Sequence, residues 1–200
     1  MRQKHYQETF TPKGYLEIYK LFPDGTQEVV LNDHNVITSG LGVTMSRLFS
    51  EESPGTRVVD EYRIGYLQLG LSGDNEPFTS MGSGIGALGA SLTASQYGST
   101  TLDVRTHNVW ASGTLQAGEA FLVVPESMIG RPAEDRVVYQ LVLDESTAND
   151  LSTPLNEIGL FSKNPFGTST HGSILCAYRA FSNITKSSAF SLVIRWTLEF

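Results

Sequence analysis

The residues with the most recognisable spacing for chemistry form the glycine motif Gly84-Ile-Gly-Ala-Leu-Gly89. Its G-x-G-x-x-G pattern matches the fingerprint of dinucleotide-binding proteins, and Asp103 lies about where that fingerprint places a ribose-binding acid. The fingerprint requires a buried parallel strand before it and a crossover helix after it, so that the pyrophosphate meets the helix N-terminus. The preceding residues, Phe78-Thr-Ser-Met-Gly-Ser83, do not form such a strand. We therefore interpret the motif as a glycine-rich loop that a neighbouring subunit can order, and we expect no cofactor.

Other residues with chemical potential also lack the partners that a site requires. Ser72-Gly-Asp-Asn-Glu76 offers oxygen ligands for calcium, but it lacks the alternating acids of an EF-hand loop, which favours a plain turn. No G-x-S-x-G elbow is present, and no serine or cysteine nucleophile can be paired with a base. The histidines are scattered, without a second ligand at zinc-site spacing: His5, His34, His107 and His171. We therefore expect no catalytic residue and no metal ligand, and predict that the protein is not an enzyme.

Aromatic side chains are the remaining candidates for binding, because an aromatic ring can pack on a sugar or a neighbouring protein. Trp196 falls on the apolar face of the last strand and is expected in the core. Trp110, in Asn108-Val-Trp-Ala-Ser112, is then the one plausible exposed platform. Tyr6 and Phe10 lie in a polar segment, where a short solvated tail would not need apolar anchors. The predicted interface residues are therefore Tyr6, Phe10 and Trp110, with sugar binding as an alternative.

Composition excludes several classes of partner. The net charge of -7 argues against direct nucleic-acid binding, which usually requires a basic face. No apolar run approaches transmembrane length, and the first residues lack the apolar region of a signal peptide, so we expect folding in a cytoplasm without membrane contact. The single cysteine, Cys176, excludes an internal disulfide. It lies in the strand-like segment Ser173–Phe181, where a buried reduced thiol is expected.

The N-terminal half predicts a hairpin followed by one helix. Tyr15–Lys20 and Gln27–Asn32 flank the turn Pro23-Asp-Gly25, in which glycine supplies a positive φ. Asn32-Asp-His-Asn35 is expected to break the second strand. A helix is then expected over roughly Gly40–Ser50, behind a threonine or serine cap. Its apolar residues recur at helical spacing: Leu41, Met45, Leu48 and Phe49.

The last strand carries the clearest periodicity. From Phe190 to Phe200 the even positions are apolar and the odd ones mainly polar, which predicts an antiparallel strand with one face in a core. We expect further strands, separated by turn signals, at 63–71, 101–106, 119–124, 136–144, 155–161 and 173–181.

Together these elements predict an all-β fold. We expect an antiparallel β-sandwich or a jelly-roll-like barrel with one short helix near residues 40–50. Residues 1–13 are predicted to form an extended arm. Residues 14–200 are predicted to form a single domain with a Gly/Ser-rich loop at 72–98, including a short helical turn near Leu88–Ala94.

Two groups of segments resemble a known kind of protein. Gly14–Lys20, Pro23-Asp-Gly25 and Asn35–Gly40, with the helix that follows, resemble the opening of virion structural proteins of tailed bacteriophages. Asn156-Glu-Ile-Gly-Leu-Phe161, followed by an L-x-A-x-R-x-F-x-x-I-x-K strand and loop (Leu175–Lys186) and an alternating last strand, is similar to the C-terminal half of tail, collar and fibre-attachment modules. The middle of the chain does not share this resemblance.

The resemblance implies a non-enzymatic structural component of a tailed-phage virion, located in the tail, collar (neck) or baseplate and assembled in the host cytoplasm. Its expected partners are other copies of itself in a ring or array and other phage structural proteins, with the arm and the 72–98 loop as contacts. A capsid decoration protein and a carbohydrate-binding β-sandwich module are the alternatives.

Overall fold

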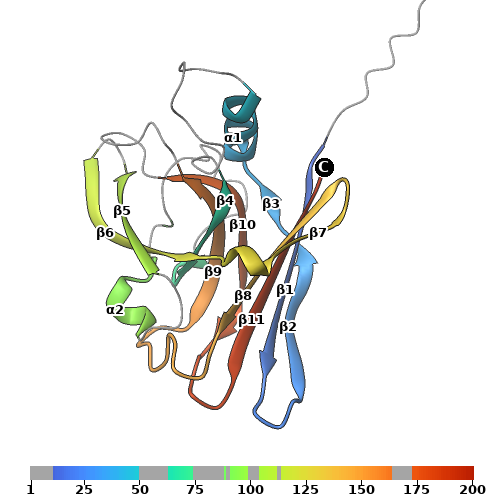
Figure 1. The fold of residues 1–200 in the computed structure, drawn as a ribbon. Helices are drawn as coiled ribbons and strands as arrows, with labels where there is room; N and C mark the ends of the chain where they lie inside the picture. Colours follow the sequence, from blue (N-terminus) through green and yellow to red (C-terminus); the bar gives the residue numbers. More distant parts are fainter. Residues whose placement is uncertain are drawn as a thin grey trace, which may run out of the picture.

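The fold is built almost entirely from antiparallel strands (Figure 1). It is given by a computed structural model that describes residues 11–49, 63–73, 88, 91–98, 104–111, 114–163 and 173–200. The elements in chain order are β1 (Lys13–Leu21), β2 (Gln27–His34), β3 (Val36–Ile37), α1 (Ser39–Phe49), β4 (Ile64–Gly70), α2 (Ala94–Tyr97), β5 (Val104–Ala111), β6 (Thr114–Val123), a 3-10 turn (Glu126–Met128), β7 (Ile129–Ala133), β8 (Arg136–Leu143), β9 (Leu155–Lys163), β10 (Ser173–Ile184) and β11 (Ser191–Glu199).

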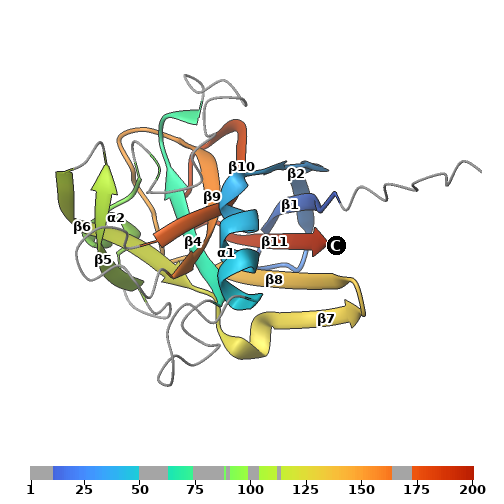
Figure 2. The same ribbon diagram turned by 90° about the horizontal axis from the view of Figure 1, so that it is seen from above.

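The strands form two sheets. Sheet A has five strands in the order β2-β1-β11-β8-β7, and sheet B has six in the order β3-β10-β9-β4-β6-β5. Figure 2, a view from above, shows β2 and β7 at opposite edges of sheet A. Because the strands are divided between two separately hydrogen-bonded sheets, the fold is a sandwich and not one closed barrel. The prediction of an all-β antiparallel sandwich is confirmed.

The last strand, β11, lies at the centre of sheet A, next to the first strand, β1. β11 pairs with β1 on one side, where Leu16 lies opposite Trp196, and with β8 on the other, where Tyr139 lies opposite Trp196. The apolar residues of β11 are fully buried, as its alternation predicts. The opposite face is not uniformly solvated, since Val193 is also buried while Arg195 is partly exposed.

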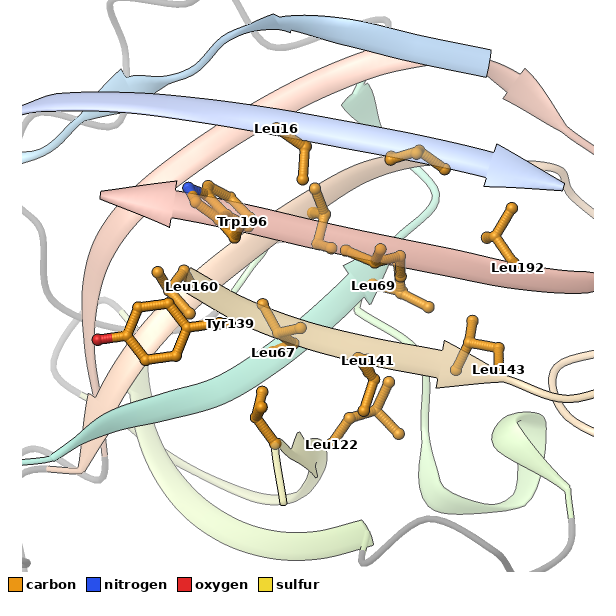
Figure 3. Packing of buried hydrophobic residues seen from close by; sticks show 14 of the residues in the cluster. Leu16, Leu67, Leu69, Leu122, Tyr139, Leu141, Leu143, Leu160, Leu192 and Trp196 are labelled. Carbon is orange, nitrogen blue, oxygen red and sulfur yellow. The ribbon is translucent and has the colours of Figure 1, made fainter. Parts of the chain in front are cut away.

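The core lies between the two sheets. Figure 3 shows side chains from β1, β8 and β11 directed towards side chains from β4, β6 and β9. Burying each large apolar side chain of this kind contributes about 1.5–3 kcal/mol. The labelled residues from sheet A are Leu16, Tyr139, Leu141, Leu143, Leu192 and Trp196, and those from sheet B are Leu67, Leu69, Leu122 and Leu160.

Helix α1 begins where the sequence predicts. The Thr38 hydroxyl accepts a hydrogen bond from the Gly40 amide at 3.2 Å and donates one to the Leu175 carbonyl of β10, so one side chain both caps the helix and docks it. Leu41 is buried. Leu48 shares its apolar character but is 42% exposed, so only part of the predicted apolar stripe reaches the core.

Several predicted boundaries are wrong. β2 continues through His34, and the chain leaves the strand at Asn35, whose backbone amide donates to the Gly14 carbonyl. The helical turn in the loop lies at Ala94–Tyr97, C-terminal to the predicted position, because Thr93 and Gln96 form a capping box there. The strand predicted at 101–106 continues to Ala111 as β5, and the strand predicted at 119–124 begins earlier, at Thr114, as β6. Both extend because they pair with each other as far as Ala111 opposite Thr114.

Candidate functional site

Strand β2 (Gln27–His34), which we call the β2 edge, forms one edge of sheet A; β5, of the same length, forms an edge of sheet B. Among the described residues the strand partner of β2 is β1, and no described strand pairs with its other side. Six of its eight residues are exposed, and the side chain of Val29 is 70% exposed. An unpaired edge offers backbone N–H and C=O groups to an additional strand. The β2 edge is therefore a candidate surface for strand addition.

The β2 edge carries two acidic residues, each in an ion pair. The Glu28 carboxylate lies 2.8 Å from the Lys20 ammonium, and the Asp33 carboxylate lies 2.6 Å from the Arg179 guanidinium. Both carboxylates remain about half exposed, at 55% and 50%. Asp24, in the adjoining turn, accepts hydrogen bonds from Thr26, which lower the pKa of the Asp24 carboxyl. Each carboxylate of the strand is thus paired with a cation, and the acid of this region without an ion pair among the described residues is Asp24 in the turn.

A bulge divides the β2 edge. Ile18 pairs with Leu31 and Tyr19 with Val29, so Val30 is an extra residue in β2. Such a bulge increases the local twist of a strand and is common at sheet edges.

The opposite edge of sheet A, formed by β7, is blunted. β7 has five residues, and its pairing with β8 loses register between Gly130 and Ala133. It also contains Pro132, which has no N–H to donate, and Arg131, which is exposed. The two edges therefore differ: β2 is longer and keeps an N–H at each residue, although it bulges at Val30, whereas β7 is short and lacks a donor at Pro132.

A polar hollow of about 400 Å³ lies near α2 and the β8–β9 connection. The hollow has hydroxyl, amide and carboxylate groups but no aromatic ring in its lining. The lining residues are Ser95, Gln96, Gly98, Ser146, Asn149, Asp150, Leu151 and Ser152.

The connection beside this hollow is held by buried Lys186. Its ammonium donates to the carbonyls of Asp144 and Ser187 at 2.9 Å each and to Asn149 Oδ1 at 3.0 Å. Burial lowers the pKa of Lys186, while the nearby charges of Asp144 and Glu145 oppose that shift. Because an ammonium has three donors and all three are used, we assign Lys186 to holding this turn.

Residues of the Asn156–Phe161 segment form a second buried cluster of hydrogen bonds, centred on Glu157, which lies on the face of sheet B away from the main core. Glu157 is 1% exposed. One of its oxygens accepts from the Ser72 amide at 3.1 Å and hydroxyl at 2.7 Å, and the other accepts from the Tyr178 hydroxyl at 3.1 Å. Asn156 Oδ1 accepts from the Gly73 amide at 2.9 Å. Ser72 and Gly73 are thus fixed by hydrogen bonds to β9. They are the first two residues of the segment Ser72–Glu76, which was considered above as a source of calcium ligands.

Leu88, inside the glycine motif, lies in the apolar cluster on the same face. It packs with Phe121, Phe161, Leu175 and Tyr178, and its amide donates to Gln68 Oε1 at 2.9 Å. Both its side chain and its amide therefore serve the fold. The other residues of Gly84–Gly89 lie outside the described residues, so the interpretation of the motif stays a prediction.

The Cys176 thiol is buried, as predicted, and its pKa is raised by that burial. Its sulfur lies 3.6 Å from Thr44 Oγ1, which lies 2.8 Å from Ser162 Oγ. A neutral thiol among hydroxyls has no base to generate the thiolate. In the described ranges, no cluster of three or more His, Cys, Asp or Glu residues could hold a metal ion.

The predicted interface residues are not brought together by the described structure. Tyr6 and Phe10 lie in residues 1–10, outside the described residues. Trp110 lies in β5, opposite Leu115 of β6, but its side chain is outside the described set. Sequence reasoning missed the β2 edge, although Val29-Val-Leu31 after the turn is the apolar run that could have drawn attention to it.

No helix in the described part of the chain is long and apolar enough to cross a membrane. Comparison of the chain with protein-family models, curated proteins and solved structures gives no match.

Proposed function

We propose that this chain is a non-enzymatic structural component of a tailed-phage virion, in the tail, collar or baseplate region, that acts through subunit assembly. The observation that carries the proposal is the β2 edge, which is long, exposed and unpaired among the described residues. Such an edge is a template for pairing with another strand, and the bulge at Val30 interrupts it at one position only. A multi-copy assembly supplies that partner by strand addition between subunits.

The segments that resemble phage modules support the proposal through their structural roles. Asn156 and Glu157 anchor the chain at Ser72 and Gly73, and Gly159 lies under the Phe161 and Leu175 side chains. Lys186 holds the turn beside the polar hollow. The resemblance therefore rests on residues that build the sandwich, which is what a shared building block requires.

The buried ionisable groups favour a structural role over catalysis. Glu157 and Lys186 are each engaged by several hydrogen bonds within the protein, and burial keeps the Cys176 thiol protonated. A catalytic group needs access to substrate and a suitable pKa. The contacts of these three groups therefore stabilise the fold.

A capsid decoration protein would use the same kind of edge, and it remains the alternative within this class. Carbohydrate binding is favoured by one observation, the polar hollow with its hydroxyl and amide groups. The absence of an aromatic ring from its described lining weighs against sugar stacking.

The proposal is tested by mass spectrometry of purified tailed-phage particles from cells that produce this chain, followed by cryo-EM of those particles. We expect the chain in multiple copies per particle, at the tail, collar or baseplate. Density on the capsid surface would select the decoration alternative. Absence of the chain from purified particles would overturn the proposal.

A glycan array separates the carbohydrate alternative. Ser152→Trp should fill the hollow, and Ser188→Trp, at another exposed serine, is the matched control. Saturable glycan binding that Ser152→Trp alone abolishes would favour the sugar-binding module.

A further inference from the structure

We propose that the β2 edge binds residues 1–10 of a second copy of this chain as an added β-strand. The inference deepens the proposed assembly function and rests on it, because it names the acceptor surface and the segment that occupies it. The acceptor is the edge Gln27–His34, whose outer side is unpaired in the described structure. The donor is identified by charge, length and residue pattern.

Self-pairing of two β2 edges is disfavoured by charge. In an antiparallel pair centred between Val30 and Leu31, Glu28 of one copy lies opposite Asp33 of the other. Like charges directly opposite each other destabilise a strand pair. The placement of Glu28 and Asp33 therefore disfavours a second β2, and their half-exposed carboxylates favour a basic strand over an acidic one.

The β7 edge is also a poor partner for β2, although it carries Arg131. It has five residues against the eight of β2, its register is broken and Pro132 lacks an N–H. A β2–β7 contact would leave much of β2 unpaired.

Residues 1–10 have the properties that the β2 edge requires. They contain Arg2 and Lys4 against one acid, Glu8, so the segment is basic while the whole chain carries a net charge of -7. Tyr6 and Phe10 fall on the same face of an extended strand, because side chains alternate with period two. Ten extended residues span about 33 Å at 3.3 Å per residue, which covers an eight-residue strand. The exposed Val29 offers an apolar contact to a ring on that face.

A second copy fits the geometry better than the chain's own segment. β1 begins at Lys13, at the end of the hairpin where β2 finishes. The chain's own residues 1–10 would have to run parallel to β2 and then cross past it to reach β1. That crossing covers two strand spacings, about 10 Å, and the three steps from Phe10 to Lys13 reach this distance only when Thr11 and Pro12 are fully extended. A segment from another copy has no such restriction.

Disulfide cross-linking between two variants tests the inference. Val29→Cys supplies the acceptor, and Met128→Cys, at another exposed apolar residue, is the matched control. The native Cys176 gives little background because it is buried. Each acceptor is mixed in turn, at low salt with a mild oxidant, with four full-length donors: His5→Cys, Tyr6→Cys, Gln7→Cys and Glu8→Cys. These donors sample both faces and neighbouring registers of an added strand.

We expect covalent dimers with Val29→Cys to exceed those with Met128→Cys at least several-fold for one or two of the donors. Their yield should fall when NaCl is raised towards 1 M, which shortens the Debye length to about 3 Å. Deleting residues 1–10 should lower the oligomer mass measured by light scattering.

The inference would be overturned by equal cross-linking of the two acceptors, by an unchanged oligomer mass after the deletion, or by no dimer with any donor. A disulfide that forms only within a single chain carrying both cysteines would show that the segment binds its own copy, which also overturns it. A dimer that forms although the chain is absent from virions would refute the virion role and leave the β2 contact standing. A chain found in virions without this cross-link would refute the contact alone.

Discussion

Replacing Trp196 by alanine should destabilise the sandwich by about 3–5 kcal/mol, the range for removing a large aromatic side chain from a packed core. Trp196 is fully buried between the two sheets (Figure 3), and its indole N–H donates to Asn35 Oδ1 at 3.1 Å. Alanine leaves a cavity in the core and an acceptor without its donor. Trp196→Phe keeps a ring and loses the donor, so we expect an intermediate loss of about 1–3 kcal/mol.

Arg195, the next residue, provides the matched comparison because it lies on the opposite face of β11. Its guanidinium lies 3.1 Å and 3.3 Å from Gln140 Oε1 and 3.4 Å from a Glu17 carboxylate oxygen. The Arg195 and Glu17 side chains are 41% and 40% exposed, so solvent screens this pair. Exposed ion pairs contribute roughly 0.2–1 kcal/mol, and Arg195→Ala should therefore cost less than about 1 kcal/mol.

Urea denaturation followed by far-ultraviolet circular dichroism measures all three variants, since fluorescence would change with the tryptophan itself. The unfolding free energies should rank Arg195→Ala above Trp196→Phe and Trp196→Ala lowest, with similar urea dependence. Equal losses at positions 195 and 196 would refute the assignment of the two faces of β11.

Three further predictions concern other parts of the fold. Gly159→Ala should lower the free energy of unfolding by about 1–3 kcal/mol, because an added Cβ would lie 2.6 Å from Phe161 Cε2 and 2.8 Å from Leu175 Cδ1. In the control, Gly130→Ala, the added Cβ meets no atom within 4 Å and should leave the unfolding midpoint unchanged. Equal shifts of the midpoint would contradict this prediction. Burial raises the pKa of Cys176 and of Tyr139 above their ordinary values of 9.0 and 10.0, so the folded protein keeps these protons at a pH where the unfolded chain releases them. The contribution of these two groups to stability should be constant below those values and fall as pH rises through them. The double variant Cys176→Ala/Tyr139→Phe should therefore lose less stability between pH 8 and 11 than wild type, and a parallel decline would contradict this. Isothermal calorimetry should detect no saturable binding of NAD, FAD or a nucleotide, because the Leu88 amide and side chain already serve the fold, and a micromolar dissociation constant would revive the dinucleotide fingerprint.

Local patterns predicted the elements whose causes are local. The alternation from Phe190 to Phe200 predicted the buried face of β11, since side chains of a strand alternate whatever lies beside it. The turn at Pro23-Asp-Gly25 predicted the β1–β2 hairpin, and its glycine has a φ of 83°. A threonine or serine cap was predicted before α1 from residue type and spacing, and the structure shows Thr38 in that role. Each of these depends on a few consecutive residues.

The sites depended on residues far apart in the chain and were not predicted. Glu157 is a buried carboxylate because Ser72 and Tyr178 meet it from other strands. Lys186 is buried because the turn after β8 supplies its acceptors. The sequence does not show which distant residues will pair with a given charged residue, so a charged residue is ordinarily expected to be exposed to solvent.

The sequence by itself determined that this is an all-β chain with a core-facing last strand and a single cysteine away from solvent. Only the tertiary structure decided that β2 lies at the edge of sheet A and that β7, at the other edge, is blunted. The physical reason is that strand periodicity reports which side chains face a core, while the position of a strand within its sheet depends on backbone hydrogen bonds to strands that can be far away in the chain. β11 fills the centre of sheet A by pairing with β1 and β8, and that order leaves β2 with one free side among the described strands.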